Sequence, residues 1–414
     1  MDLRRRYHQW KRPRPMRETD HAMIVIAFTL CLYGVIMVHS ATADSVSGSM
    51  ALDQAIRVGF GMVMLWILSR FSLRFWRAIA SPAYGITLFL LFIVLFMGYT
   101  RGGATRWLTF GPLVLQPSEL AKVGIPLALA AFLAGRKQES SWRTIGIAAV
   151  LVGLPFGLIL LQPDLGTGLV LVPVLIVMLW WADIPLLNLF SVLAPFISII
   201  CAFSLISWAG LMTVVVTVLR RARAGFWRFS IVIVSCIATG LMTPYVWQLL
   251  EDYQKKRILI FLNPGIDPRG SGWNVIQSKI AVGSGQVLGK GFMEGTQKGL
   301  AFLPEQHTDF IFSVIGEELG WIGTHVLLVL FFILIWRMIG ISSQCRSSFA
   351  RILAMGYSVS IAVQVVVNVG MTIGLLPVTG LPLPLVSYGG SHVIASLTMI
   401  GIIQSLNRHR KEIS

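Results

Sequence analysis

Residues 22–38 read AMIVIAFTLCLYGVIMV, an apolar run long enough to cross the hydrocarbon core of a bilayer as one helix. Runs of this kind recur along the chain and are separated by short polar loops. Inside a bilayer the backbone must satisfy its own hydrogen bonds, and an α-helix does so within one segment. The sequence therefore predicts an all-α, polytopic membrane protein.

The composition of the 414 residues agrees with this prediction. The chain is 55% hydrophobic and 13% charged, whereas soluble domains are about 25% charged. Its net charge of +16 lies in short clusters beside apolar runs rather than on one continuous face, so we expect no nucleic-acid partner. The four cysteines lack metal-like spacing and are interpreted as packing thiols.

The segment before the first run is strongly basic and reads MDLRRRYHQWKRPRPMR. A signal peptide has a similar pattern, but no convincing cleavage site follows, so we interpret the run as a retained helix. By the positive-inside rule, residues 1–21 form a cytoplasmic arm, residues 22–406 one membrane domain, and residues 407–414 a cytoplasmic tail. After the first helix, further helices are predicted at 54–69, 78–98, 117–134, 144–162, 167–182, 226–249, 310–336, 352–374 and 390–406, which gives ten core helices.

Successive spans should place the loops alternately on the two sides of the membrane, and the apolar run 186–219 does not fit this alternation. Asp183 before it and the basic stretch RRARAGFWR after it both belong in the cytoplasm, so an even number of crossings must separate them. We therefore predict an extra apolar hairpin over 186–219, bent near Pro195 or around 204–210. Residues 251–309 then form a long extracytoplasmic loop.

With this topology the polar motifs fall together at the outer mouth of the bundle. Ionisable groups at membrane depth usually line a cavity or a path, so we expect a site there. The motifs are RGGATRWL (101–108), QPSELAK (116–122), QPDLGTG (162–168), the long loop, and LPLVSYGGS (383–391).

Several residues in these motifs could have either a structural role or a role in substrate binding. Glu119 and Lys122 share one helical face and form either a structural ion pair or a substrate contact. Arg106 could hold a phosphate, and Trp107 could stack on a sugar or belong to the interfacial aromatic belt. Asp164 is best explained as a helix N-cap.

The long loop contains GSGWNVIQSKIAVGSG (270–285), whose glycines lack the context of a nucleotide-binding loop. We interpret it as an amphipathic segment on the membrane surface, with Lys279 and Lys290 available to anionic headgroups or a pyrophosphate. The scattered histidines favour no metal site built from three protein ligands.

The stretch FLPEQHTDFIF (302–312) concentrates proton-exchanging groups. Asp309 could cap the following helix, but Glu305 and His307 lie close by, and Glu317 and Glu318 follow two turns deeper. A carboxylate shielded from water beside other acids has a raised pKa and can act as a general base near neutrality. Proton relay in a transporter is the other reading of these acids.

Seven ordered motifs of the chain resemble those of the SEDS family (shape, elongation, division and sporulation). They are RW at 106–107, QPSELAK, QPDLGTG, GSGWNVIQSKIAVGSG, FLPEQHTDFIF, GEELG (316–320) and LPLPLVSYGGS (381–391). The resemblance covers nearly the whole chain except the basic arm and about 183–249. IQSKIAVGSG and GKGFMEGTQ are most similar to the elongation member, although a sporulation-type member stays open.

The resemblance implies a peptidoglycan glycosyltransferase of the bacterial cytoplasmic (inner) membrane that polymerises lipid II and releases undecaprenyl pyrophosphate. It implies a class B penicillin-binding protein as partner and places the catalytic residue of the family on Asp309. A divalent cation, Mg²⁺ or Mn²⁺, could help the pyrophosphate leave, but no cofactor is certain. We assign substrate binding to Arg106, Trp107, Glu119, Lys122, Lys279, Glu305, His307, Glu317, Ser387 and Tyr388.

Two other functions fit the same residues. A flippase for the lipid-linked precursor would use the same cavity and buried ion pair. A scaffold for cell-wall enzymes would tolerate replacement of Asp309 and Lys279.

Overall fold

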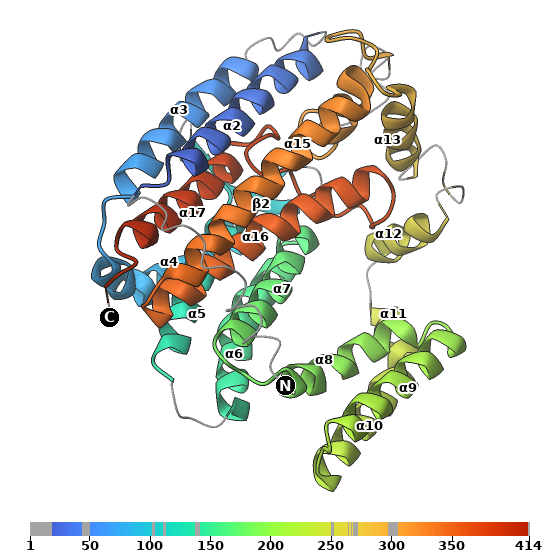
Figure 1. Cartoon of the computed structure of the whole chain (residues 1–414). Helices are drawn as coiled ribbons and strands as arrows, with labels where there is room; N and C mark the ends of the chain where they lie inside the picture. Colours follow the sequence, from blue (N-terminus) through green and yellow to red (C-terminus); the bar gives the residue numbers. More distant parts are fainter. Residues whose placement is uncertain are drawn as a thin grey trace.

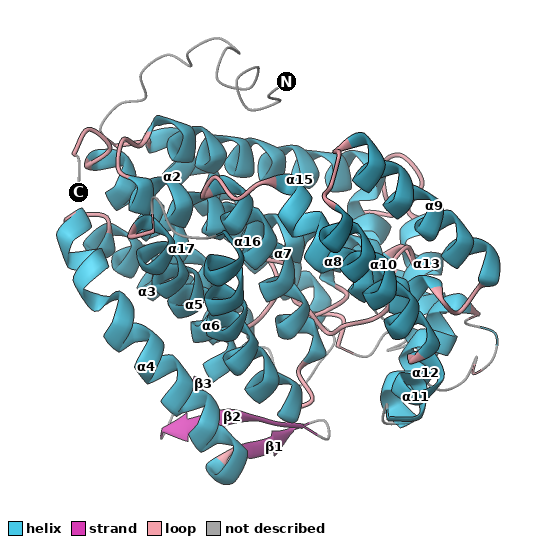
Figure 2. Ribbon diagram, turned by 90° about the horizontal axis from the view of Figure 1, so that it is seen from below, coloured by secondary structure: helices cyan, strands magenta, loops and turns pink. Residues whose placement is uncertain are grey.

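The computed structural model describes residues 19–43, 50–101, 104–110, 113–136, 141–249, 252–263, 265, 267, 272–296 and 305–412. These residues form a bundle of helices (Figure 1) with a small sheet at one end (Figure 2). Most of the predicted basic arm lies outside the described residues, as do parts of the predicted long loop.

The main bundle consists of helices at positions that the apolar runs predict. Seven helices among the described residues are long and apolar enough to cross a membrane, namely α2–α6, α15 and α16. The polytopic membrane fold is therefore confirmed. The bounds are α2 (His21–Thr42), α3 (Met50–Leu68), α4 (Leu73–Met97), α5 (Pro117–Ala134), α6 (Ser141–Leu161), α7 (Leu165–Trp181), α15 (Ile311–Gln344), α16 (Ser348–Thr372) and α17 (Gly390–Arg408).

Long-range contacts sort the helix ends into two sets. At one end, which we call the terminal end, Arg337 of α15 pairs with Asp20 just before α2, with 2.8 Å between Nε and Oδ2. At the opposite end, which we call the Asp309 end, Ser40 near the end of α2 donates to Glu318 of α15 at 2.6 Å. The chain alternates between these ends, so the loops that carry the polar motifs meet at the Asp309 end.

Close approach between helices depends on small residues. Gly61 of α3 lies against the side chain of Leu397 of α17, and a Cβ at Gly61 would come 2.5 Å from it. Gly401 of α17 lies against the backbone of Leu65, where a Cβ would come within 2.9 Å. In a bilayer, where the hydrophobic effect does not drive helices together, such contacts supply the van der Waals attraction between them.

Helix α15 is interrupted at Gly320, which has φ 62° and ψ −158°. The break releases backbone groups that would otherwise bond within the helix, and residues 286–291 satisfy them. Lys290 N–H donates to the carbonyl of Glu317 at 3.0 Å, and Trp321 N–H donates to that of Gln286 at 2.9 Å. A Cβ at Gly320 would overlap the backbone of residues 287–289, so glycine is required for this close approach.

A three-stranded antiparallel sheet covers the Asp309 end beside α4, in the order β1–β2–β3. Its strands are β1 (Tyr99–Arg101), β2 (Ala104–Phe110) and β3 (Leu113–Leu115). Figure 2 shows it at one end of α4, next to the helices of the bundle. The apolar periodicity of the spans did not predict this sheet, because its strands are short and lie in a loop.

Residues 186–249 form a separate group of helices to one side of the bundle, which we call the α8–α10 unit (Figure 1). Its helices are α8 (Leu186–Cys201), α9 (Leu205–Arg221), α10 (Phe226–Leu241) and the short α11 (Thr243–Leu249). The run 186–219 holds two helices that reverse direction at Ala202–Ser204, while α8 continues through Pro195. The unit has its own small core, which includes Leu219 and Cys236.

Three details of the expected topology differ in the structure. The predicted core helix 226–249 is two helices, α10 and α11, bent by 41° relative to each other and placed in the α8–α10 unit. The prediction that α15 ends near residue 336 is wrong, because the helix continues to Gln344 and Arg337 is held inside it by Asp20. The long loop contains α12 (Asp252–Leu262) and α13 (Trp273–Ser284), and α13 packs against α15 through Ser278 and Ser313, whose Oγ atoms are 2.6 Å apart.

Candidate active site

Asp309 lies two residues before the first residue of α15, at the Asp309 end of the bundle. The N-cap position of α15 is Phe310, and no side chain makes a capping hydrogen bond there. The alternative role of Asp309 as a helix cap is therefore wrong. Its carboxylate is half-buried and lies near Gly380, from whose Cβ position Oδ2 would be 3.4 Å away.

Two segments fix the backbone around Asp309. The amide nitrogen Nδ2 of Asn368 on α16 donates to the carbonyls of Asp309 at 2.9 Å and Leu381 at 2.7 Å. Ser387 Oγ donates to the carbonyl of Thr308 at 2.6 Å. These bonds join the loop 305–310 to the loop 373–389, so the position of Asp309 depends on residues about 60 to 80 positions later.

The predicted residues His307 and Tyr388 belong to the same junction. Tyr388 N–H donates to the carbonyl of His307 at 2.9 Å, and the two rings meet edge to face with centroids 5.6 Å apart. Arg57 of α3 lies over the Tyr388 ring at 5.0 Å. Nearby, Gln54 of α3 donates to the carbonyl of Ser387 at 3.1 Å. Helix α3 therefore also supports the loop that holds Asp309.

The environment of Asp309 favours its protonated form. Burial, which removes water from the carboxylate, and the neighbouring charge of Glu305 raise the pKa of Asp309 to about 7. Arg257 and Arg106 act in the opposite direction and lower this pKa, while Asp164 adds a smaller increase. A carboxyl group whose pKa is raised toward neutrality suits a role in which it must accept a proton there.

Arg106 of β2 and Asp164 before α7 form a second polar group at this end. Their ion pair spans 3.8 Å between a guanidinium nitrogen and Oδ1, and Arg106 also donates to the carbonyls of Gln162 and Pro163. Asp164 caps α7 by accepting from Thr167 N–H at 3.4 Å, as predicted. Its other oxygen accepts from Ser118 at 2.8 Å, which ties α7 to α5. Trp107 follows Arg106 in β2, partly exposed.

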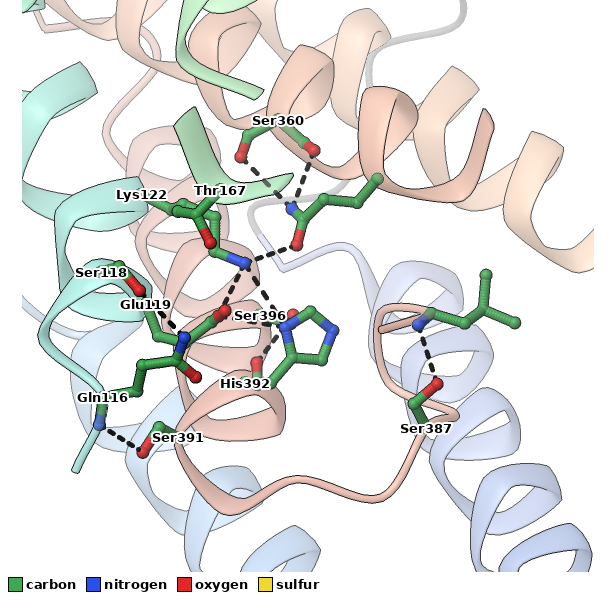
Figure 3. A network of polar contacts seen from close by, with 12 residues as sticks. Gln116, Ser118, Glu119, Lys122, Thr167, Ser360, Ser387, Ser391, His392 and Ser396 are labelled. Atoms are coloured by element: carbon green, nitrogen blue, oxygen red, sulfur yellow. Dashed lines mark hydrogen bonds and ion pairs between the residues drawn. The ribbon is translucent and has the colours of Figure 1, made fainter. Parts of the chain in front are cut away.

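Glu119 and Lys122 of α5 meet inside the bundle, 2% and 1% exposed, with 2.7 Å between Oε2 and Nζ (Figure 3). Glu119 Oε2 also lies 3.0 Å from Nδ1 of His392 on α17. Lys122 donates to Oε1 of Gln364 on α16 at 2.7 Å. We call these four side chains the Glu119 cluster. It connects three helices, which favours the structural reading of this pair.

Glu317 and the lysines of the long loop are arranged differently from the prediction. Glu317 is buried and accepts from Lys290 at 2.6 Å and from Thr296 Oγ1 at 2.9 Å. Lys290 is thus engaged in an ion pair, and its predicted availability to headgroups is wrong. Lys279 is exposed on α13, and its side chain lies across Gly374 at the end of α16. Glu305 is exposed beside Asp309.

Several residues of this region were not assigned to the site from the sequence, among them Arg257, Asn368, Gln364 and His392. Arg257 affects the pKa of Asp309 from α12, where the basic stretch YQKKR was the only signal. Asn368 and Gln364 are polar residues one turn apart in an apolar helix, a pattern that could have indicated them. His392 follows the SYGGS motif directly.

The described residues contain no group of three His, Cys, Asp or Glu side chains that could hold a metal ion. Mg²⁺ is often bound by one or two carboxylates together with substrate phosphates. The acids near Asp309 could supply such a pair, so a divalent cation fits this end only if substrate oxygens complete its coordination.

Fold and site together define the class of the protein. It is a polytopic membrane protein with a half-buried carboxylate of raised pKa at one end of the bundle. The charges of Arg106 and Arg257 act on this carboxylate, and segments distant in the sequence fix its position. This arrangement suits an enzyme that works on a lipid-linked, anionic substrate at the membrane surface.

Comparisons with known proteins agree. The family model of FtsW, RodA and SpoVE, described as cell cycle protein, matches residues 20–223 and 208–412. The chain therefore belongs to this family. It is 36% identical to the peptidoglycan glycosyltransferase MrdB of Escherichia coli over 95% of both chains, and 31% identical to the peptidoglycan glycosyltransferase RodA of Treponema pallidum over 96% and 99%.

Solved structures give the same result. One of them, described as "Structural coordination of polymerization and crosslinking by a peptidoglycan synthase complex", matches with a TM-score of 0.71 at 31% identity over 95% of this chain and 99% of that chain. The rod shape determining protein RodA of Thermus thermophilus matches with a TM-score of 0.63 at 28% identity over 95% and 98%. The elongation-type resemblance is confirmed.

Proposed function

We propose that Asp309 is the general base of a glycosyl transfer that extends glycan strands of peptidoglycan. The chain is a peptidoglycan glycosyltransferase of the elongation type. In our mechanism the carboxylate of Asp309 removes the proton from the 4-hydroxyl of the acceptor sugar. The resulting oxygen nucleophile attacks the anomeric carbon of the lipid-linked donor with inversion, and the bond to the pyrophosphate breaks.

The proposed substrate is lipid II, and undecaprenyl pyrophosphate is the proposed leaving group. Its negative charge requires cations near the reacting carbon. Arg106, Arg257 and Lys279 are the candidates at the Asp309 end. A divalent cation, with the pyrophosphate among its ligands, would supply further charge neutralisation.

The raised pKa of the Asp309 carboxyl group is the main support for this proposal. Its pKa of about 7 makes it a base at neutral pH, whereas a carboxylate in water would be a much weaker one. The same shift explains why the site needs several loops: water must be excluded from Asp309 without burying it beyond reach of a sugar. The residues that hold it come from α16, α3 and the loop 373–389, which meet the loop 305–310 at this end.

The proposal includes the orientation of the protein in the cytoplasmic membrane of a bacterium. Basic residues gather at the terminal end, with Arg70, Arg74 and Arg77 around the α3–α4 turn and Arg220, Arg221 and Arg223 where α9 ends. By the positive-inside rule this end and both termini would face the cytoplasm. The Asp309 end would then face the side on which cell-wall strands are built.

We propose a class B penicillin-binding protein as the partner that crosslinks the glycan strands. A solved relative is described as part of a peptidoglycan synthase complex that coordinates polymerization and crosslinking.

The function is tested by incubating the purified protein with lipid II, with and without such a transpeptidase, and separating the glycan products by length. We expect polymer from the wild type and at least about 10²-fold less from Asp309→Asn. Asp183→Asn removes an acid at the terminal end and should leave polymerisation unchanged. Movement of lipid II across a reconstituted bilayer without polymer would contradict the proposal and favour a flippase.

A further inference from the structure

The α8–α10 unit carries an unbalanced charge. Residues 184–250 contain four arginines but no acidic residue and no lysine. Arg220, Arg221 and Arg223 are exposed where α9 ends, and the described part of the chain places no carboxylate within ion-pair distance of them. The acid that lies before α8, Asp183, pairs with Arg351 of α16 at 3.2 Å. The three arginines therefore present their charge outward.

A cavity of about 530 Å³ lies where this unit meets the main bundle. Helices α7, α8 and α9 line it on one side and leave it partly open, with side chains that include Trp180, Phe190, Leu193 and Val218. Ligand pockets commonly measure about 300–1,000 Å³, so the cavity has the size of a binding site. Because its lining side chains are apolar, its occupant must offer hydrocarbon rather than polar groups.

The cavity and the arginines are adjacent. Ala222 lines the cavity, and its neighbours in the chain are Arg221 and Arg223. An occupant that enters the cavity beside Ala222 therefore lies next to the chain positions of Arg221 and Arg223. Trp227 follows these arginines in the sequence, and tryptophan side chains are enriched in the lipid headgroup region of a membrane.

We propose that this cavity binds one acyl chain of an anionic glycerophospholipid, whose phosphate is held by Arg220, Arg221 and Arg223. Guanidinium groups bind phosphate through paired hydrogen bonds, and basic pockets between membrane helices suit anionic lipid headgroups. A neutral lipid would fill the cavity without using the arginines. Inorganic phosphate would use the arginines without filling the cavity.

The bound lipid would connect the unit to the bundle. Among the helices of the main bundle, α7 is the one that shares this cavity with α8 and α9. An acyl chain between them would replace missing side-chain contacts there. The site lies at the terminal end, away from Asp309, so it is separate from the proposed catalytic residues.

The test uses the purified full-length protein in nanodiscs made of phosphatidylglycerol and phosphatidylcholine with identical acyl chains. Native mass spectrometry then counts the lipid molecules that stay bound to the protein after it is released from the nanodisc. We expect the wild type to retain one phosphatidylglycerol in preference to phosphatidylcholine. In R220Q/R221Q/R223Q this preference should fall on the order of tenfold, because three headgroup contacts are lost.

Two further variants separate charge from cavity. R220K/R221K/R223K keeps the charge and should retain most of the preference. Leu193→Trp fills the cavity and should reduce retention of both lipids while the arginines stay in place. Tryptophan fluorescence on heating checks that each variant is folded.

The matched control is R70Q/R74Q/R77Q, which removes three exposed arginines at the same end of the bundle but beside the α3–α4 turn. It should leave lipid retention unchanged. The proposal is overturned if this control reduces retention as strongly, if Leu193→Trp has no effect, or if phosphatidylcholine is retained equally well. Retention of a prenyl phosphate in place of the phospholipid would also overturn it.

Discussion

Asp309 and Glu119 are two acids at the same end of the bundle, but their surroundings differ. Glu119 is buried within an ion pair with Lys122 and beside His392, and all its contacts come from helices. Asp309 is half-buried on a loop, and another acid, Glu305, lies next to it. The chain thus neutralises one acid completely and leaves the other poorly neutralised.

The difference shows how a membrane protein can hold charge for two purposes. A buried charge with a matched partner joins helices, because separating the pair would leave a charge in a medium of low polarity. An acid without a full partner is costly to ionise, and this cost is what raises its pKa and makes it a base near neutrality. We interpret the Glu119 cluster as structural and Asp309 as chemical.

The largest expected effect is on the rate of polymerisation by Asp309→Asn. Loss of a general base lowers a rate by about 10²–10⁴-fold, and the isosteric amide leaves the loop contacts in place. The initial rate on purified lipid II at pH 7.5 measures this loss. A variant rate within about threefold of the wild-type rate would show that Asp309 is not the general base.

The same variant should also change how the stability of the protein depends on pH. The folded-state pKa of Asp309 lies above its ordinary value of 3.8, so its ionisation destabilises the fold as the pH rises from about 4 through 7. Asp309→Asn cannot ionise. Its unfolding temperature should therefore match the wild type near pH 4 and exceed it at pH 8.

The second prediction concerns the Glu119 cluster. Lys122→Met leaves Glu119 buried without its main cation and should lower the free energy of unfolding by about 3–5 kcal/mol. The double variant Glu119→Gln/Lys122→Met removes both charges and should recover much of this loss. Thermal unfolding in detergent measures both. If the single and double variants were equally unstable, the ion pair would not be the cause.

The third prediction uses two residues one turn apart on α16. Gln364 bonds Lys122, whereas Asn368 bonds the carbonyl of Asp309. Asn368→Leu should lower the rate at least about tenfold, because small displacements of a catalytic group are costly. Gln364→Leu should mainly reduce stability, by about 1–3 kcal/mol. The comparison of rate and unfolding temperature in both variants checks this, and equal rate losses would argue against separate roles.

The smallest expected effects are shifts in the pH dependence of the rate. The rate should rise as Asp309 loses its proton near pH 7. Glu305→Gln removes a charge that raises this pKa, so the rise should move to lower pH. Arg257→Gln removes a charge that lowers it, so the rise should move to higher pH. Rates between pH 5 and 9 test the directions, and shifts of the same sign would contradict the assignment of these neighbours.

Much of the fold follows from residue patterns. The apolar runs predicted the spans, and the basic clusters predicted which loops lie together, because both depend on how each segment partitions into a bilayer. The small sheet and the break of α15 at Gly320 escaped prediction. A glycine in an apolar run has many meanings, and only the packing of residues 286–291 against it explains its conformation.

The site was predicted in part. Asp309 and its neighbour Glu305 stand in one short motif, so the sequence alone could indicate them. Arg257 and Asn368 come from other segments, and their approach to Asp309 depends on the packing of α12 and α16. Lys290 was assigned to headgroups because its partner Glu317 lies 27 positions away, and spacing gives no signal for such a pair.

The sequence by itself determined that this chain crosses a membrane many times and that its polar motifs meet at one end. Hydrophobicity and charge act on each segment separately, so they can be read from the order of residues. The tertiary structure decided which acid is neutralised and which is left reactive. That choice depends on distances between side chains from different helices, because electrostatic interactions in a medium of low polarity change steeply with position.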